Sequence, residues 1–164
     1  MSDAPESAFE PGVRISRATT ADAELVAGLV RDGFRSEAAR YGVEIPPMRE
    51  TAADVRAELE DGDVVLLARL DGEPIGTVRG HAQPDGSILV RRLGVLPALR
   101  RRGIARELMA ALEAAYPEAR RFELFTGAET SPAIALYESL GYVRSREQEQ
   151  MPGVTIVYLE KCRG

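Results

Sequence analysis

The sequence predicts one α/β domain in which a mixed, mostly antiparallel sheet is flanked by helices. Its 164 residues are the length of an ordinary single domain. Apolar strand-like segments joined by short turns occupy the middle of the chain and indicate an antiparallel meander, and strand and helix patterns then alternate in the same sheet. No repeat or linker divides the chain, so we expect a flexible tail over residues 1–12 and one domain over residues 13–164.

Hydrophobic periodicity and turn residues place the elements. Apolar runs bounded by Gly, Pro and Asp predict strands over residues 13–18, 64–70, 75–79, 88–95, 122–126, 142–144 and 154–161. Apolar residues at helical spacing, preceded by Thr, Gly or Ser, predict helices over residues 20–32, 51–60, 104–116 and 131–140. The first helix is expected to end at Asp32-Gly33, and residues 34–50 to form a mobile connection.

Composition excludes several classes of protein. Hydrophobic residues make up 45% and charged residues 29%, which excludes a disordered acidic tail and a membrane protein. The acidic first ten residues lack the basic region of a secretory signal. One cysteine, Cys162, and one histidine, His81, exclude an internal disulfide and a clustered His/Cys metal site. We therefore expect a cytoplasmic protein that holds no metal and has no membrane partner.

The charge distribution points to an anionic ligand. The net charge is −5, but residues 91–106 carry six arginines and no acid, so the rest of the chain carries −11. A basic segment on an acidic body attracts anions. A nucleic-acid partner is not expected, because the basic run has no interleaved aromatic residues and the whole chain is acidic.

The basic segment lies between a predicted strand and a predicted helix. The first turn of a helix leaves backbone N–H groups unpaired at the positive end of its dipole. Gly103 lets the backbone approach a ligand oxygen, and the small side chain of Ala105 keeps that approach open. Arg100, Arg101 and Arg102 oppose the dipole at about 0.3–1 kcal/mol each, a penalty that an anion would relieve. We interpret the segment as a phosphate cradle, with a solvated helix start as the alternative.

Two motifs resemble the GCN5-related N-acetyltransferase (GNAT) family. The family's acetyl-CoA signature, Arg/Gln-x-x-Gly-x-Gly/Ala, is matched by Arg100, Gly103 and Ala105, after residues 93–97 that look like the end of its fourth strand. Residues 133–142 are similar to the motif A-x-x-L-Y-x-x-x-G-F/Y that follows its fifth strand. The resemblance implies acetyl-CoA bound between splayed strands four and five, and transfer of its acetyl group to a primary amine by direct attack in a ternary complex.

The resemblance also implies roles for individual residues. The implied cofactor-binding set is Leu93, Gly94, Val95, Arg100, Arg101, Arg102, Gly103, Ile104, Ala105, Arg106, Thr130, Ser131 and Tyr137. The amides of residues 101–106 would bind the pyrophosphate, and the backbone of Leu93 and Val95 the pantetheine arm. Tyr137 would be the catalytic acid for the departing thiolate, which is plausible because tyrosine and thiol pKa values lie near ~10 and ~8.5. Simple core packing is the alternative for Tyr137.

The sequence departs from the family pattern at two positions. Many relatives carry a glutamate early in the fourth strand that takes a proton from the amine, and Leu89 stands there instead. The remaining candidates for this base are His81, Glu123, Glu129 and solvent. The family often has an asparagine where Thr130 stands.

The acceptor and the oligomeric state are left open. A small-molecule or peptide amine is expected, and the acidic body favours a cationic one. Because the base is missing, a non-catalytic acetyl-CoA sensor on the same fold is a second hypothesis. Many relatives pair as homodimers through their C-terminal strands, here residues 142–144 and 154–159, but paired and unpaired edge strands look alike in sequence. Cys162 is not expected to carry the acyl group.

Overall fold

The computed structural model describes residues 12–42, 45–128 and 131–163. The described strands are β1 (Val13–Arg17), β2 (Val64–Leu70), β3 (Glu73–Ala82), β4 (Ile88–Val95), β5 (Arg121–Gly127), β6 (Val143–Met151) and β7 (Val154–Cys162). The described helices are α1 (Ala23–Tyr41), α2 (Ala52–Glu60), α3 (Ile104–Ala114) and α4 (Ser131–Ser139), with 3-10 turns η1 (Thr20–Asp22), η2 (Pro46–Arg49) and η3 (Pro97–Leu99). The predicted tail lies outside these residues apart from Gly12.

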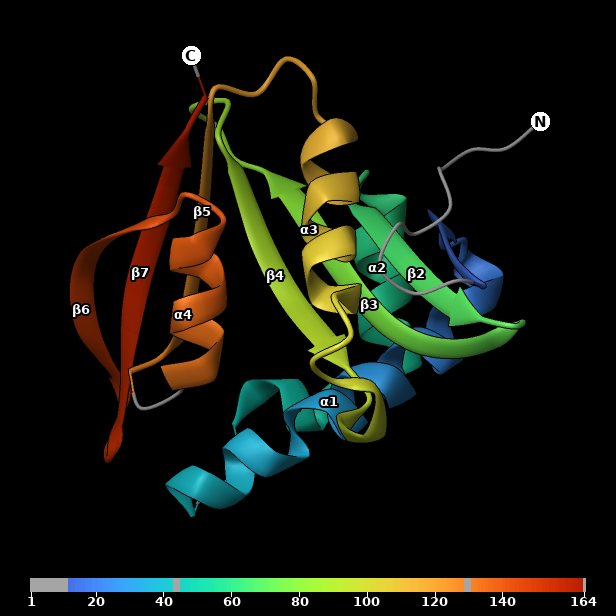
Figure 1. Cartoon of the computed structure of the whole chain (residues 1–164), viewed down its shortest axis with the longest axis horizontal. Coiled ribbons are helices and arrows are strands. Elements are labelled where there is room, and N and C mark those ends of the chain that lie inside the picture. The colour runs from blue at the N-terminus through green and yellow to red at the C-terminus, as the bar shows by residue number, and fades with distance from the viewer. Residues whose placement is uncertain (1–11, 43–44, 129–130, 164) are drawn as a thin grey trace.

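The strands form one sheet in the order β1-β2-β3-β4-β5-β7-β6 (Figure 1). The neighbours β4 and β5 are parallel, and the other pairs are antiparallel. The predicted mixed, mostly antiparallel sheet flanked by helices is therefore confirmed. None of the described helices is both long enough and apolar enough to cross a bilayer.

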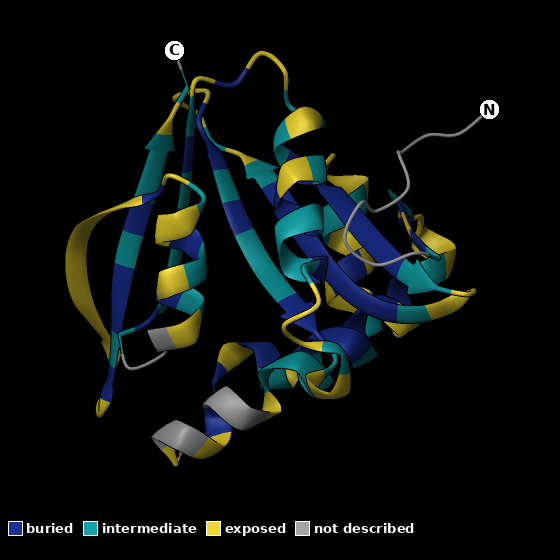
Figure 2. Ribbon diagram, viewed as in Figure 1, coloured by how far each residue is buried: buried dark blue, intermediate teal, exposed yellow. Residues whose placement is uncertain are grey.

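The sheet separates two hydrophobic cores (Figure 2). The larger core is enclosed by α3 and α4 and includes Leu108 and Phe122, both 0% exposed. The smaller core lies under α1 and α2, where Val30 and Leu67 are equally buried. Each helix buries its apolar face against the sheet, as the periodicity of the sequence predicts.

Helix α1 is longer than predicted. It continues through Gly33 to Tyr41 and is closed by Gly42, whose left-handed backbone has φ 70°. A Cβ atom at Gly33 would lie only 3.1 Å from the Cα atom of Gly94 in β4. The predicted end at Asp32-Gly33 was wrong because this glycine allows close helix–strand packing and does not cap the helix. The expected connection over residues 34–50 is likewise mostly helix α1 and the turn η2.

Other boundaries follow local signals more closely. Helix α2 starts with a capping box: the amide of Asp54 donates to the Thr51 hydroxyl at 3.2 Å, and the amide of Thr51 donates to the Asp54 carboxylate at 3.0 Å. Strand β6 extends to Met151, well beyond the predicted residues 142–144. Its polar side chains are exposed along almost its whole length (Figure 2), so the sequence lacks the alternation that marks a half-buried strand.

The turn between β3 and β4 is held by a short polar network. The Asp85 carboxylate accepts hydrogen bonds from the hydroxyl of Ser87 at 2.6 Å and from its amide at 2.9 Å. A guanidinium N–H of Arg121 on β5 donates to the same carboxylate at 2.9 Å. The hydrogen bonds from Ser87, followed by the one from Arg121, lower the pKa of Asp85 to about 2.

Strands β4 and β5 separate soon after they begin. They pair at Ile88 with Phe122 and at Leu89 with Glu123, and no further pairs form along these two fully described strands. On its other side β4 contains a bulge, because Thr77 and Arg79 of β3 pair with Gly94 and Arg91, leaving one extra residue in β4. The bulge includes Arg92, whose φ is 56°. A bulge bends its strand, which explains why β4 turns away from β5 and opens the gap that holds the candidate site.

Candidate active site

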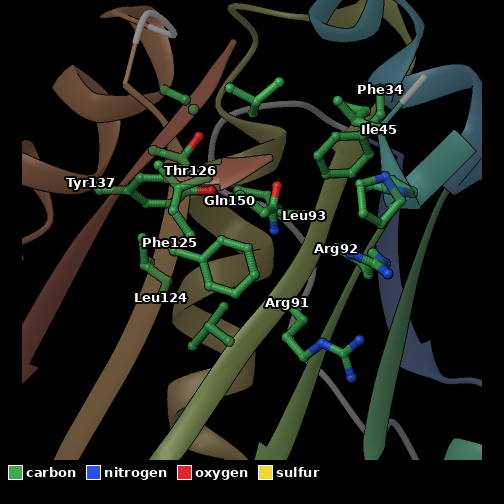
Figure 3. Close-up of a pocket in the computed structure, with 17 residues that line it drawn as sticks. Phe34, Ile45, Arg91, Arg92, Leu93, Leu124, Phe125, Thr126, Tyr137 and Gln150 are labelled. Carbon is green, nitrogen blue, oxygen red and sulfur yellow. The ribbon is translucent and has the colours of Figure 1, made fainter. Parts of the chain in front are cut away.

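Two cavities meet beside the separated strands. The larger cavity, of about 560 Å³, lies between β4, the bend before α3, and α4. The smaller cavity, of about 110 Å³, lies between β4, β5 and the α1–η2 region (Figure 3). Both cavities are lined by Phe34, Leu93, Ala133 and Tyr137. Molecules occupying the two cavities would therefore touch at this junction.

The larger cavity brings together most of the predicted cofactor-binding residues. Those that line it are Leu93, Gly94, Val95, Arg100, Arg101, Gly103, Ile104, Ala105, Arg106 and Tyr137. Arg102 is exposed and is not among the lining residues. Helix α4 spans Ser131–Ser139, and its second residue, Pro132, lines the cavity. Thr130 and Glu129 lie outside the described residues.

The bend before α3 has the backbone geometry of an anion cradle. Arg101 and Gly103 both have left-handed conformations, with φ of 67° and 80°. Helix α3 starts directly after Gly103, so helical geometry leaves the N–H groups of its first turn without intrahelical acceptors. Left-handed residues in a tight bend turn successive N–H groups into one concavity. The predicted open amino end of α3, facing a cavity, is therefore present.

The arginines of the bend have different contacts. Arg100 donates from Nε to the Val95 carbonyl at 3.2 Å and from Nη2 to the Gly33 carbonyl at 2.8 Å, so it ties the bend to β4 and α1. Arg106 donates to the Ser139 hydroxyl at 2.8 Å and links α3 to α4. Arg101 is exposed at the cavity wall. The side chain of Arg100 thus supports the shape of the cradle.

Tyr137 lies at the junction of the two cavities (Figure 3). It is 8% exposed, and its ring meets that of Tyr142 edge to face at 6.1 Å between centroids. The Tyr142 hydroxyl in turn donates to Glu113 at 3.0 Å, and burial followed by the charge of Glu113 raises the pKa of Tyr142. Tyr137 is therefore both a packed residue and a cavity-lining one, so the two interpretations of the sequence are compatible.

The smaller cavity is lined mainly by residues with apolar side chains and has a cationic edge. Its walls come from α1 and η2 on one side and from β5, α4, β6 and β7 on the other. Among the described residues that line it, Arg91 and Arg92 carry the only formal charges. No acidic side chain lines it within that set, so the cavity differs from the acidic mouth that the overall charge of the chain suggested.

The candidate bases on the sheet do not reach either cavity. Strand register places His81 and Glu123 on either side of Leu89, yet none of these three residues lines a cavity. His81 Nδ1 lies 2.8 Å from a carboxylate oxygen of Asp63, and Glu123 lies near Gln83. Cys162, at the end of β7, is exposed and lines neither cavity, as expected of a residue without an acyl-carrier role.

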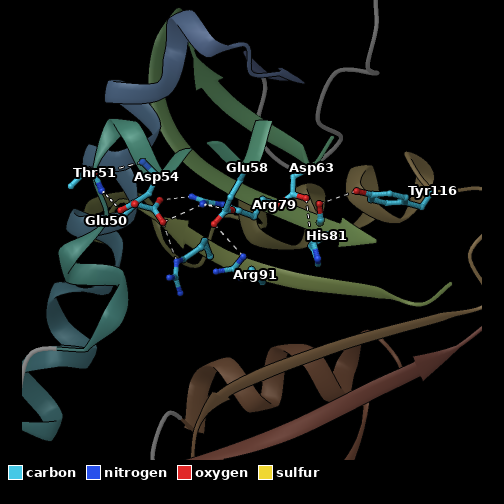
Figure 4. Close-up of polar contacts among 11 residues, drawn as sticks. Glu50, Thr51, Asp54, Glu58, Asp63, Arg79, His81, Arg91 and Tyr116 are labelled. Carbon is cyan, nitrogen blue, oxygen red and sulfur yellow. Dashed lines mark hydrogen bonds and ion pairs between the residues drawn. The ribbon is translucent and has the colours of Figure 1, made fainter. Parts of the chain in front are cut away.

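A buried charge cluster underlies the cationic edge (Figure 4). Arg79, which is fully buried, forms a bidentate pair with Glu50 and also contacts Glu58 at 2.9 Å. Nη1 of Arg91 lies 3.3 Å from a carboxylate oxygen of Glu58, and Nε of Arg92 lies 3.3 Å from a carboxylate oxygen of Glu50. We name these five residues the arginine–glutamate cluster. Sequence analysis missed it, although an arginine inside the apolar run of β3 is the signal that could have indicated a buried partner.

Burial and pairing act in opposite directions within this cluster. Burial alone would raise the pKa of Glu58, but the hydrogen bond and charge of Arg79 bring that pKa below its usual value. Burial lowers the pKa of Arg92, and the nearby charge of Glu50 opposes this effect. The charged guanidinium of Arg92 is therefore incompletely stabilised by its protein surroundings.

Comparisons with known proteins identify the fold. An acetyltransferase (GNAT) family model matches residues 31–142. One similar solved structure is the PaiA N-acetyltransferase of Thermoplasma acidophilum in complex with coenzyme A, with 15% identity, a TM-score of 0.74, and coverage of 92% of this chain and 98% of that chain. Another is YncA, a putative acetyltransferase from Salmonella typhimurium with acetyl-CoA, with 16% identity, a TM-score of 0.72, and coverage of 93% and 95%.

A third similar structure is the GNAT domain of PAT from S. lividans, with 25% identity, a TM-score of 0.71, and coverage of 92% of this chain and 90% of that chain. No curated protein sequence matches the chain. The family model spans more than half of the chain, and the solved structures share its architecture over nearly their full lengths. The chain belongs to the GNAT family of acetyltransferases.

Proposed function

We propose that this N-acetyltransferase transfers the acetyl group of acetyl-CoA to a primary amine by direct attack within a ternary complex. The observation that carries the proposal is the junction of the two cavities at Leu93 and Tyr137. A donor in the larger cavity and an acceptor in the smaller one would meet there without a covalent enzyme intermediate. Holding both reactants side by side removes much of the entropic barrier to a bimolecular reaction.

The larger cavity offers partners for two parts of acetyl-CoA, its pyrophosphate and its pantetheine arm. The pyrophosphate would bind the N–H groups at the amino end of α3, where the helix dipole favours negative charge. The pantetheine arm would lie along residues 93–95 of β4, an edge that β5 leaves unpaired after the strands separate. Its amide groups can then bond to the strand as an added strand would. The thioester would end near Tyr137.

The chemistry needs one bond formed, one broken and two protons moved. The amine nitrogen attacks the thioester carbonyl carbon, the C–S bond breaks, and Tyr137 gives its proton to the departing thiolate. The tyrosinate regains a proton from the nitrogen, through water, as the neutral amide forms, so that both protons lost by the ammonium group are accounted for. The titratable described residues lining the smaller cavity are Arg91, Arg92 and Tyr137, none of which is an effective base at neutral pH. We therefore propose that the amine loses its first proton to water before attack, so that kcat/KM rises with pH up to the pKa of the amine.

Steady-state kinetics with release of free CoA test this proposal. Initial velocities at varied acetyl-CoA and amine should give intersecting lines, whereas parallel lines would indicate an acyl-enzyme and refute direct attack. Cys162→Ala should retain activity. Calorimetry that shows stoichiometric acetyl-CoA binding without CoA release from any amine would favour the sensor hypothesis instead.

The role of Tyr137 has its own test. Tyr137→Phe should lower kcat by about 10²-fold, the lower end of general acid catalysis, while the Kd for acetyl-CoA stays within about twofold of the wild-type value. Tyr158→Phe is the matched control, because that tyrosine lines neither cavity. Unchanged turnover in Tyr137→Phe would remove the acid role and leave Tyr137 as a packing residue.

Cytoplasmic location and homodimer formation stay predictions. Strand β6 is an edge of the sheet and is exposed along most of its length, so its backbone is open to a second copy. Its many charged residues oppose such pairing unless the partner supplies opposite charges. Sedimentation velocity measures the oligomeric state, and fractionation of the source cell measures the location.

A further inference from the structure

The charge balance of the arginine–glutamate cluster leaves one positive charge in excess. Within the cluster, Arg79, Arg91 and Arg92 share the two carboxylates of Glu50 and Glu58. Other charged groups surround the cluster. The guanidinium of Arg31 donates to the backbone carbonyl of Glu50, and the exposed Arg49 and the carboxylate of Asp54 lie on the same side as Glu50 and Glu58.

Two arginines of the cluster, Arg91 and Arg92, bring positive charge to the smaller cavity. Arg79 is fully buried and its guanidinium is shared by both glutamates, whereas Arg91 and Arg92 line the cavity. The side chain of Arg92 is only 16% exposed, and its ion pair with Glu50 is made through Nε. Figure 3 shows Arg92 on the wall formed by β4 and α1, opposite Tyr137. An anion in the cavity would pair with a cation that the protein has already desolvated.

The left-handed backbone conformation of Arg92 indicates that its side chain has a binding role. Its φ of 56° is a conformation that glycine or asparagine adopts more readily than arginine. An arginine in a left-handed bulge is strained, and such strain gathers at binding and active sites. The bulge thus presents a guanidinium at a place where a glycine would be the simpler choice.

We infer that the acceptor amine carries a carboxylate, and that Arg92, assisted by Arg91, binds this carboxylate so that the amine points toward Tyr137. The inference rests on the proposed function and names its substrate class. Two arginines and no acid are among the described residues that line this cavity, and the planar guanidinium fork fits the two carboxylate oxygens. Protein N-termini and polyamines lack this group, so they are poor acceptors.

The rest of the cavity defines the remainder of the acceptor. Phe34, Ile45 and Pro47 form one apolar wall, and Leu124 and Phe125 form the other. At about 110 Å³, against about 560 Å³ for the larger cavity, the smaller cavity favours a small acceptor. The acceptor class is therefore a small amino acid-like molecule, with an amine, a carboxylate and a compact apolar side chain.

Matched acceptors test the inference without any mutation. Free CoA release is measured for leucine and methionine, for their primary amides, and for the corresponding amines without a carboxyl group, each at a pH that gives equal fractions of free amine. We expect kcat/KM to be about 10- to 100-fold higher for the acids, the range of a charge-assisted hydrogen-bond pair. Amides that match or exceed the acids would overturn the inference while leaving acetyl transfer intact.

Substitution then assigns the preference to a residue. Arg92→Gln should lower the acid-to-amide ratio of kcat/KM toward one, chiefly by raising KM for the acids, and Arg92→Lys should restore part of it. Arg56→Gln, an exposed arginine on α2 outside the cluster, is the control and should keep the ratio. A ratio that persists in Arg92→Gln, with acetyl-CoA still bound, would overturn the assignment. Acetyl-CoA binding with no CoA release from any acceptor would reject the proposed function itself.

Discussion

Two glycines of helix α1 offer a direct measurement of how closely the helix approaches the sheet. Both Gly28 and Gly33 lie in the interior of α1, so replacing either by alanine gives a similar gain in helix propensity, up to about 1 kcal/mol. They differ in what an added Cβ would meet. At Gly28 no atom lies within 4 Å, whereas at Gly33 the Cα of Gly94 lies at 3.1 Å and its carbonyl carbon at 3.5 Å.

The contact distances set the expected magnitudes. Gly28→Ala should raise the free energy of unfolding by about 0.5–1 kcal/mol, because nothing opposes the gain in propensity. At Gly33 the Cβ would have to separate two backbones from 3.1 Å to the ordinary range of about 3.5–4.0 Å. Overpacking of this kind typically costs about 1–3 kcal/mol, so Gly33→Ala should be less stable than Gly28→Ala by that amount.

Thermal unfolding and acetyl-CoA titration measure the pair. For a chain of this size each 1 kcal/mol corresponds to about 2–4 °C in Tm, so the two variants should differ by several degrees. Displacing Gly94 would also disturb the larger cavity, so acetyl-CoA affinity should fall in Gly33→Ala and not in Gly28→Ala. Equal stabilisation by both substitutions would refute the close packing of α1 on β4 and, with it, this account of why the helix continues through Gly33.

Three further predictions follow from buried and bridging groups. Glu50→Gln should reduce the free energy of unfolding in urea by about 3–5 kcal/mol, because it breaks the buried pair with Arg79 and leaves a desolvated cation. The hydrogen bonds from Ser87 are the main reason that the pKa of Asp85 is about 2. The ionised carboxylate of Asp85 therefore stabilises the fold fully above about pH 4 and progressively less toward pH 2. Asp85→Asn should therefore show a shallower fall in Tm over that window. Arg100→Gln, which removes the bridge from the bend to α1 and β4, should raise the acetyl-CoA Kd roughly tenfold by calorimetry.

Features set by local signals could be predicted from the sequence. The turn residues and apolar runs placed every strand of the meander, and Thr51 with Asp54 placed the start of α2. The phosphate cradle could also be predicted, because a strand end, a glycine and a helix start follow one another within a dozen residues. Its residues come together because consecutive segments of chain need no distant partner to bring them close.

Features that depend on distant contacts could not be predicted in the same way. Glu50 and Arg79 are separated by 29 positions, and only the packing of α2 and η2 on the sheet makes them a pair. Gly33 gives the same local signal whether it caps a helix or packs against a strand, and its neighbour Gly94 decides between the two. The cationic edge of the smaller cavity was hidden for the same reason. Net charge describes the whole surface, while a binding cavity is governed by the few side chains that line it.

One extra residue in β4 has consequences for both reactants. A regular strand would continue to pair with β5, which would close the gap and occupy the edge on which we propose that the pantetheine arm lies. The bulge at Arg92 turns β4 away from β5 and, by the same change of direction, places a guanidinium on the wall of the smaller cavity. Donor and acceptor sites are thus consequences of a single backbone irregularity. A glycine at this position would preserve the bulge, but it would remove the contact by which we infer that the acceptor is chosen.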